Sequence, residues 1–347
     1  MRIDPPQIPT PTWIGSFWMT PWPFALQTAP FPAVVDPRRY YPSTSHENAL
    51  RGLVSAWQEG EPWISLSGAP GTGKTLLLHL LMEMIPQNSR LAYITQPLRD
   101  PADLIRLVAH DWHLDDGSAP TGVARNRVVE AILDGLRQGT PPLVLIEQAD
   151  LMSEASADEL VSWSLLQGKG QAGIQVVLCA RGELPGLAAL AGLHDAWEMV
   201  GGGGALSPLD PVEASDFLRF QIRWAGGHPD RILGHEAENR IIQICGGNPR
   251  RLCQLGRHAS RLAAGAGMAS IELEAVEEAA QNLWGASMAQ SEQDHELAQP
   301  SSEDFENLEE QKETDPELRS ETGQAPAEKT ASWQAQETPS FLLRRSA

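Results

Sequence analysis

Residues 68–75 read GAPGTGKT, which fits the pattern G-x-x-x-x-G-K-[ST] of a phosphate-binding loop. The loop follows a short apolar run at residues 63–66 and precedes a leucine-rich stretch at residues 76–81, so it lies between a predicted strand and a predicted helix. Backbone N–H groups of such a loop converge on phosphate oxygens at a helix N-terminus, where the peptide dipoles add positive potential. We therefore expect the loop to bind the phosphates of a nucleotide through Gly68, Ala69, Pro70, Gly71, Thr72, Gly73, Lys74 and Thr75.

Two side chains of the loop have separate expected roles. Lys74 should reach the β- and γ-phosphates of ATP, and the hydroxyl of Thr75 should bind Mg²⁺. The alternative is a glycine-rich turn between strand and helix that binds no ligand. The complete motif in its strand and helix context favours the site for ATP and Mg²⁺.

Short apolar runs separated by helical stretches surround the loop in the sequence. They lie at residues 63–66, 91–94, 143–146 and 174–179, and the pattern stops near Leu206. Strands that are covered on both faces read as continuously apolar, so this alternation predicts an α/β fold with a parallel sheet.

The sequence after Leu209 is typical of helices. Asp210, Pro211 and Glu213 form a predicted N-cap, first-turn proline and capping acid for the first helix. Three further helices are expected near residues 237–245, from residue 248 onwards and over residues 270–284. Together they predict a small helical bundle.

Composition divides the chain into four expected parts. They are a proline- and aromatic-rich arm over residues 1–45, a P-loop nucleotide-binding domain over 46–208, a helical lid domain over 209–285 and a disordered acidic tail over 286–347. The tail holds 14 acidic and 5 basic residues, which is typical of disorder. The arm should pack partly on the body of the protein, because it carries the apolar aromatic residues Trp13, Phe17, Trp18, Trp22 and Phe24.

Net charge and cysteine content narrow the classes of function. The formal charge of −19 opposes binding to nucleic-acid phosphates through bulk charge, so a DNA partner is less expected. Cys179, Cys245 and Cys253 have no C-x-x-C spacing, which indicates neither a disulfide framework nor a zinc site and favours a cytoplasmic protein. Eight prolines interrupt the uncharged residues 5–35, so no membrane span is expected there.

A carboxylate follows the third apolar run, where residues 143–146 lead into Glu147 and Gln148. A side chain directly after a buried parallel strand emerges at the carboxyl edge of the sheet, beside the phosphate loop. We therefore expect Glu147 to act on Mg²⁺. Asp150 is a further, weaker candidate.

The ordered series of motifs resembles the ExeA-type (GspA-type) secretion ATPases, which have relatives in pilus biogenesis and transposition. The motifs are PWPFALQTAPFPAVVDPRRYYPSTSHENALRGL, GAPGTGKT, LIEQADL, IQVVLCARGEL, ALSPLDPVEASDFLRFQIRWAGG and GGNPRRLCQL, and the likeness extends to about Leu283. The resemblance implies an AAA+ fold, in which a parallel α/β nucleotide domain and a helical lid hold ATP at their junction.

The resemblance also implies catalytic roles. The family typically has Asp-Glu after this strand, the Asp acting on the Mg²⁺ shell and the Glu polarising the attacking water, whereas this chain has Glu147-Gln148. Neutral Gln148 cannot accept a proton but can orient water, so hydrolysis should suffer more than binding. A shift of one residue would instead make Glu147 the catalytic carboxylate and leave Ile146 at the metal position. Arg250, in GGNPR, matches the lid arginine that turns toward the γ-phosphate, and a solvated arginine is the alternative.

The resemblance also bears on three further positions, which in the family hold a polar sensor residue, an arginine and a residue near the adenine. The usual polar sensor position falls near Arg181. Where the family places an arginine offered to a neighbouring subunit's ATP, this chain has Glu198 and Met199, so that arginine is absent unless Arg181 replaces it. His46 lies where family members place a residue near the adenine, and a helix cap or surface residue is the alternative.

Three functions are consistent with these residues. The favoured one is an ATP-binding AAA+ protein that acts as a nucleotide-dependent switch or assembly factor in secretion or pilus-type machinery, with a protein of that machinery as partner. It would be an ATPase with weakened turnover, because of Gln148 and Met199. The alternatives are a fully active AAA+ ATPase that works as a homo-oligomer, and an ATP-dependent DNA-targeting protein of the transposition type, which the net charge disfavours.

Overall fold

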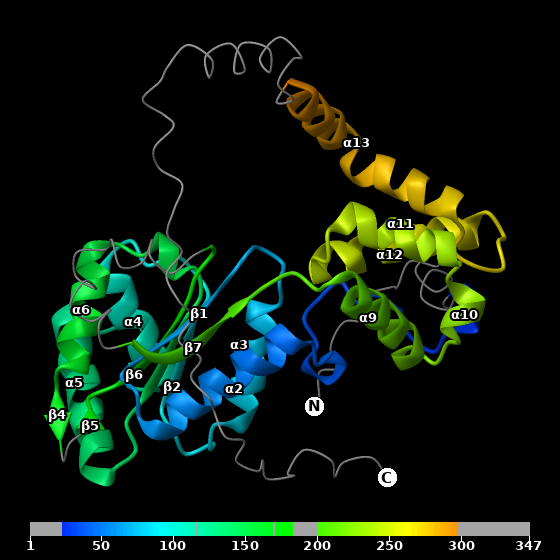
Figure 1. Ribbon diagram of the computed structural model, residues 1–347. Helices are drawn as coiled ribbons and strands as arrows, with labels where there is room; N and C mark the ends of the chain where they lie inside the picture. The colour runs from blue at the N-terminus through cyan, green and yellow to red at the C-terminus, as the bar shows by residue number, and fades with distance from the viewer. Residues whose placement is uncertain (1–22, 116, 169–170, 183–199, 298–347) are drawn as a thin grey trace, which may run out of the picture. The chain divides into compact units, whose positions relative to one another are not determined.

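The computed structural model describes residues 23–115, 117–168, 171–182 and 200–297 of the 347-residue chain (Figure 1). Contacts divide the chain after Gly285 into two units, residues 1–285 and 286–347. The second unit is described only along the backbone, at the end of one helix. Within the described residues no helix is long and apolar enough to cross a lipid bilayer.

Among these residues, five parallel strands form the sheet of the nucleotide-binding part, in the order β2-β3-β6-β1-β7. The strands are β1 Trp63–Gly68, β2 Leu91–Ile94, β3 Leu143–Ile146, β6 Gln175–Cys179 and β7 Val200–Leu206. The apolar runs predicted as strands coincide with the first four, and the α/β fold class is confirmed. The fifth strand, β7, has no counterpart in the sequence-based prediction. A separate antiparallel pair is formed by β4 Gln167–Gly168 and β5 Gln171–Ala172.

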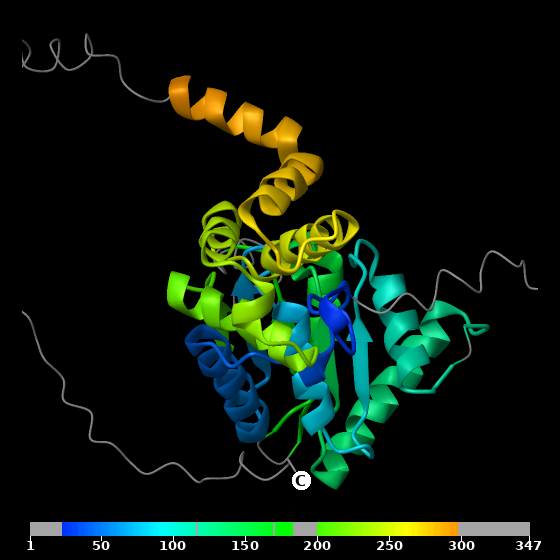
Figure 2. The same cartoon turned by 90° about the vertical axis from the view of Figure 1, so that its right-hand side faces the viewer.

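Alternate side chains of each strand face opposite layers of helices. In β3, Leu143 and Leu145 pack in the cluster that contains α2 and α3, whereas Val144 and Ile146 pack in the cluster that contains α4, α5 and α6. Figures 1 and 2 show these two groups of helices on opposite faces of the sheet. Their bounds are α2 Thr44–Glu59, α3 Lys74–Met84, α4 Pro101–Asp111, α5 Thr121–Gln138 and α6 Glu154–Ser164. Burial on both faces explains why the strands read as continuous apolar runs.

Strand β7 contains four consecutive glycines and lies against helix α2. A Cβ at Gly203 would lie 1.8 Å from the Ser65 carbonyl oxygen of β1, and its φ of +135° is one that other residues rarely adopt. A Cβ at Gly204 would lie 2.5 Å from the Cβ of Ala49 in α2, and one at Gly52 would lie 2.2 Å from the Gly203 carbonyl oxygen. Glycine on both sides of this contact therefore lets the helix approach the strand backbone directly.

The described residues include five helices of the lid: α9 Pro211–Trp224, α10 Pro229–Ile232, α11 His235–Cys245, α12 Pro249–Gly265 and α13 Leu273–Leu297. The capping box predicted for the first is present, because the Glu213 N–H donates to Asp210 Oδ1 at 2.8 Å and the Asp210 N–H donates to Glu213 Oε2 at 3.4 Å. The single turn α10 was not expected. The apolar faces of these helices share one core, separate from the two cores that flank the sheet.

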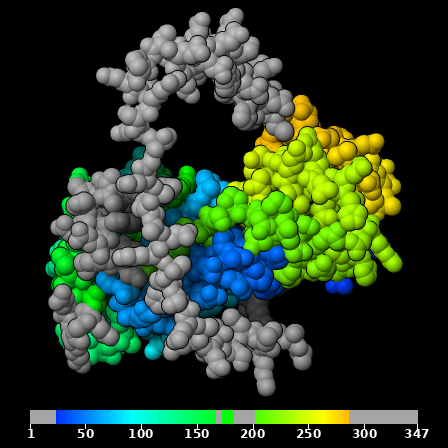
Figure 3. Space-filling view, in the orientation of Figure 1, coloured from blue at the N-terminus to red at the C-terminus, as the bar shows by residue number. Residues whose placement is uncertain are grey.

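The described part of the arm, residues 23–45, packs mostly on the lid. The Phe31 side chain is completely buried in the lid core, against Gly256 of α12. The Arg39 guanidinium lies 4.0 Å from the centroid of the Trp224 ring. Figure 3 shows this early, blue part of the chain beside the green lid helices. Packing of the arm is thus confirmed for Phe24, which contacts the lid core, whereas Trp13, Phe17, Trp18 and Trp22 lie outside the described residues.

Candidate functional site

The phosphate loop connects β1 to α3, as the motif predicts. Gly68, Gly71 and Gly73 have φ angles of +148°, +84° and +105°, which L-residues rarely adopt. A Cβ at Gly71 would lie 2.7 Å from Asn248 Oδ1, and a Cβ at Gly73 would lie 2.5 Å from His46 Nε2. Both the backbone conformation and the neighbouring side chains therefore require glycine at these positions.

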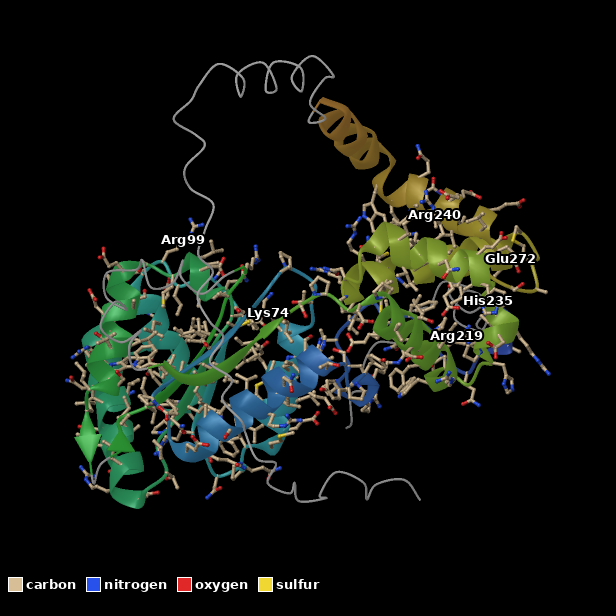
Figure 4. The ribbon with its side chains drawn as sticks, viewed as in Figure 1. Lys74, Arg99, Arg219, His235, Arg240 and Glu272 are labelled. Carbon is tan, nitrogen blue, oxygen red and sulfur yellow. The ribbon has the colours of Figure 1, made fainter. Side chains whose placement is uncertain are left out.

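Lys74 and Thr75 open helix α3, and Figure 4 shows Lys74 at the start of that helix. The Lys74 Nζ donates hydrogen bonds to the carbonyl oxygens of Gly68 at 2.6 Å and Ala69 at 2.9 Å. Burial lowers the pKa of the Lys74 ammonium group. In the described part of the chain no carboxylate lies within ion-pair distance of this ammonium, so a phosphate would be its first anionic partner.

A buried histidine holds the loop from the side of α2. His46 is 4% exposed, and its Nε2 lies 2.8 Å from the Thr72 carbonyl oxygen. Because a carbonyl can only accept, Nε2 carries the hydrogen, and Nδ1 of the neutral ring accepts from the Ser43 hydroxyl at 2.6 Å. Burial lowers the pKa of His46, which favours this neutral form. The alternative of a surface residue is wrong, and the structure gives His46 a contact that the sequence did not indicate.

The lid contacts the same loop through the first turn of α12. The Arg250 backbone N–H donates to the Gly71 carbonyl oxygen at 3.2 Å, and the Asn248 side chain donates to the Pro70 carbonyl oxygen at 2.8 Å. The Asn248 Oδ1 also caps the helix by accepting from the N–H groups of Arg250 and Arg251. The Arg250 backbone thereby lies at the phosphate loop, while the residue as a whole is exposed, so its role toward the γ-phosphate stays a prediction.

A cavity of about 630 Å³ adjoins the phosphate loop and has the size of a small-molecule site. The predicted site residues that line it are Gly71, Gly73, Lys74, Thr75 and Arg250, together with His46, which was expected near the adenine. The arm contributes residues 32–36 to the wall, and the lid contributes Phe217 and Gln221. Glu147 and Gln148 are not among the residues that line this cavity, and we call the part of the site that follows β3 the acidic side.

The acidic side follows β3. The Glu147 Oε1 accepts a hydrogen bond from the Tyr93 hydroxyl at 2.8 Å, and burial together with this carboxylate raises the pKa of Tyr93. Tyr93 lies on the neighbouring strand β2 and was not among the expected site residues, because the pairing of β2 with β3 is not visible in the sequence. The carboxylates of Glu147 and Asp150 are both near enough to Lys74 to raise its pKa, which opposes the larger effect of burial.

Gln148 directly follows Glu147 and is held at both ends of its amide. Its Nε2 donates to the Thr95 carbonyl oxygen at 2.9 Å, and its Oε1 accepts from the Arg181 guanidinium at 3.0 Å. The Arg181 backbone N–H donates to Asp150 Oδ1 at 3.1 Å. Glu198 and Met199, where the sequence lacks the expected arginine, lie outside the described residues.

These residues fit a nucleotide with Mg²⁺. The loop has backbone N–H groups at a helix N-terminus, and Lys74 is a cation without a carboxylate at ion-pair distance among the described residues. The Thr75 hydroxyl and the Glu147 carboxylate carry oxygen atoms of the kind that Mg²⁺ prefers, and these two side chains would hold the ion. The adjoining cavity has room for the rest of the ligand.

The parallel sheet, the phosphate loop between β1 and α3, and the helical lid define a P-loop protein of the AAA+ class. Residues 58–187 match a family model described as an AAA domain. It is similar to general secretion pathway protein A of Aeromonas hydrophila, with 26% identity over 228 residues, which are 65% of this chain and 42% of that protein. The resemblance to ExeA-type (GspA-type) proteins is therefore confirmed, and the chain spans less than half the length of this relative.

Solved structures share the fold. Cdc6p from Pyrobaculum aerophilum aligns with a TM-score of 0.54 at 16% identity, over 72% of each chain. The Drosophila ORC bound to DNA aligns with a TM-score of 0.55 at 16% identity, over 81% of this chain and 69% of that chain. A Walker-type ATPase of Pyrococcus abyssi aligns with a TM-score of 0.52 at 14% identity, over 78% and 80%. At these identities the similarity is one of fold alone.

Proposed function

We propose that the chain binds MgATP and acts as a nucleotide-dependent switch or assembly factor with slow hydrolysis, in secretion or pilus-type machinery. The observation that carries the proposal is the Lys74 ammonium, which lies in a complete phosphate loop beside a cavity of about 630 Å³ and has carbonyl oxygens as its partners. The similarity to general secretion pathway protein A supports the choice of machinery.

Each predicted site residue has a role in this proposal. The loop N–H groups and Lys74 hold the phosphates, Thr75 and Glu147 hold Mg²⁺, and Arg250 contributes charge from the lid. When bound, Mg²⁺ neutralises part of the phosphate charge. Since the α12 backbone is hydrogen-bonded to the loop at Gly71, occupancy of the site should change how the lid is held, which is the physical basis of a switch.

Slow hydrolysis is proposed because Gln148 is neutral. A glutamine orients water but cannot take its proton, and a positioned base typically contributes about 10² to 10⁴ in rate. The fully active ATPase remains the alternative enzyme, in which Glu147 acts as the base. The DNA-targeting alternative has less support, because the formal net charge is −19.

Thermal unfolding with and without MgATP tests the proposal. At about 100 times its dissociation constant, a ligand of the folded state should add about 2.7 kcal/mol to the unfolding free energy. Lys74→Ala should abolish this gain. Arg137→Ala is the control, because Arg137 is exposed in the last turn of α5, before the N-terminal end of β3. A melting temperature that MgATP leaves unchanged, or raises equally in Lys74→Ala, contradicts ATP binding at this loop.

The expected partners follow from the same proposal. We infer that the partner is a protein of the secretion or pilus machinery. If the protein is instead a fully active ATPase, we expect it to operate as a homo-oligomer. Sedimentation of the purified protein with and without MgATP measures whether assembly depends on the nucleotide.

A further inference from the structure

Gln148 and Arg181 are joined across the carboxyl edge of the sheet. The residues are 33 positions apart and follow neighbouring parallel strands, β3 and β6. The Arg181 Nη2 donates to Gln148 Oε1 at 3.0 Å, and the Gln148 Nε2 is anchored on the Thr95 carbonyl oxygen at 2.9 Å. Both side chains are therefore oriented by contacts within one chain, although both remain accessible to solvent.

This pair lies beside the phosphate loop. The Gly182 N–H donates to the Gly68 carbonyl oxygen at 3.3 Å, and the same oxygen accepts from Lys74 Nζ at 2.6 Å. Arg181 therefore directly precedes Gly182, whose backbone contacts Gly68, the first residue of the phosphate loop. The Arg181 charge is close enough to lower the pKa of Lys74, in the same direction as burial. Arg181 and Lys74 therefore place two cations at this edge of the loop, where Asp150 and Glu147 offset part of their charge, and a polyanion would be attracted to both cations.

The backbone of Gln148 supports a functional role for its placement. Its φ of 52° and ψ of 39° lie in the left-handed region, which costs a non-glycine residue about 1–2 kcal/mol. Glycine would remove that cost, but it would also remove the amide that Arg181 and Thr95 hold. Strain of this kind persists where surrounding structure fixes it, and it clusters at active sites.

We propose that Gln148 and Arg181 form an intramolecular catalytic pair for the slow hydrolysis put forward above, Gln148 orienting the attacking water and Arg181 stabilising charge on the transferred phosphoryl group. In this step the water oxygen forms a bond to the γ-phosphorus while the bond from that phosphorus to the β–γ bridging oxygen breaks, giving ADP and phosphate. The neutral amide takes no proton, so the water proton leaves with the phosphate product or enters solvent. The inference rests on the proposed function, because it requires ATP at the loop.

A glutamine and an arginine supplied by the same chain are sufficient for slow phosphoryl transfer. Gα proteins, which carry both, hydrolyse GTP at about 10⁻² per second, whereas removal of the arginine contribution lowers such rates by about 10³ or more. We therefore expect this protein to turn over ATP at a comparable slow rate as a monomer. The rate per chain should not require a neighbouring subunit.

Binding of ADP with and without aluminium fluoride tests the pair independently of turnover. Aluminium fluoride bound beside ADP resembles the transferred phosphoryl group, and the 347-residue chain should bind ADP with aluminium fluoride at least about tenfold more tightly than ADP alone. Arg181→Ala should remove most of that preference and leave the ADP affinity within about threefold, because the arginine acts on the terminal group. Arg181→Lys keeps the positive charge but loses the planar guanidinium with its paired N–H donors, so it should retain part of the preference for aluminium fluoride. Arg137→Ala is the matched surface control.

The outcomes separate this inference from the proposed function. Normal ADP binding with an unchanged fluoride preference in Arg181→Ala overturns the pair but leaves ATP binding intact. Absence of nucleotide binding in the wild type overturns both. Turnover per chain should stay constant over about a hundredfold range of protein concentration while sedimentation shows monomer. A rate that rises with self-association would instead place the charge-stabilising group on a neighbouring chain, and would overturn the inference.

Discussion

Replacing His46 tests how the phosphate loop is held in shape. His46→Ala removes the donor to the Thr72 carbonyl oxygen, and Thr72 is fully buried. Leaving one buried polar group unpaired costs about 1–3 kcal/mol. The corresponding fall in melting temperature is about 2–12 °C for a domain of this size. His46→Gln carries an amide that can donate to the same carbonyl, so it should recover much of the loss.

The same change should weaken MgATP binding. Without His46, the loop would become ordered only when the nucleotide binds, and the free energy of ordering it would be subtracted from the binding free energy. A loss of about 1–3 kcal/mol corresponds to a dissociation constant about 5- to 150-fold higher. Isothermal titration of the three proteins with MgATP measures this. His110→Gln is the control, because His110 is exposed on α4. Equal affinities for wild type and His46→Ala would refute the idea that His46 preorganises the loop.

The pH dependence of stability gives a second measurement on the same residue. Burial lowers the pKa of His46, so the folded state favours the neutral ring. This contribution to the unfolding free energy is complete above the unfolded pKa of about 6.5 and is lost as the pH falls from there through the lowered folded pKa. Urea unfolding across that window should show a steeper loss in wild type than in His46→Gln. A constant difference between the two proteins would contradict the assigned protonation state.

Further substitutions test the packing that supports the site, each by urea unfolding. Gly52→Ala should lower the unfolding free energy, because about 1–3 kcal/mol of overpacking against β7 exceeds a helix-propensity gain of about 1 kcal/mol, whereas Gly122→Ala, with open space around it, should be neutral or stabilising. Phe31→Ala should cost about 3–5 kcal/mol, since the side chain is completely buried in the lid core, and a loss below about 1 kcal/mol would mean that the arm does not dock there. Arg219→Ala should cost about 3–5 kcal/mol, because it leaves the buried Glu238 carboxylate without its bidentate partner, and Glu238→Gln in that background should restore part of the loss.

The strands β1, β2, β3 and β6 could be predicted because their residues are buried or partly buried between two layers of helices, so apolar residues occupy most positions. Strand β7 could not, because its glycines carry no hydrophobic pattern. Those glycines are required by the close approach of α2, and the helix lies some 150 positions earlier in the chain. When the residues of a strand are selected by a close contact with a distant helix, as in β7, they need not show the apolar pattern by which strands are predicted.

The candidate site shows the same division. The phosphate loop could be predicted, because its glycine conformations and the lysine are specified by eight consecutive residues. The contacts of His46 with Thr72 and of Tyr93 with Glu147 could not, because they join residues 26 and 54 positions apart. Neither histidine nor tyrosine has a local pattern that marks such a role.

Gln148 shows how a contact changes the meaning of a substitution. Considered alone, it lacks the carboxylate that would activate water. Beside the Arg181 guanidinium, a carboxylate at position 148 would form an ion pair, which would lower the pKa of its acid form and make it a weaker base. The neutral amide avoids that pairing and leaves the positive charge of Arg181 uncompensated by residue 148. Glutamine at this position is therefore chemically matched to the arginine, and the two residues have to be evaluated together.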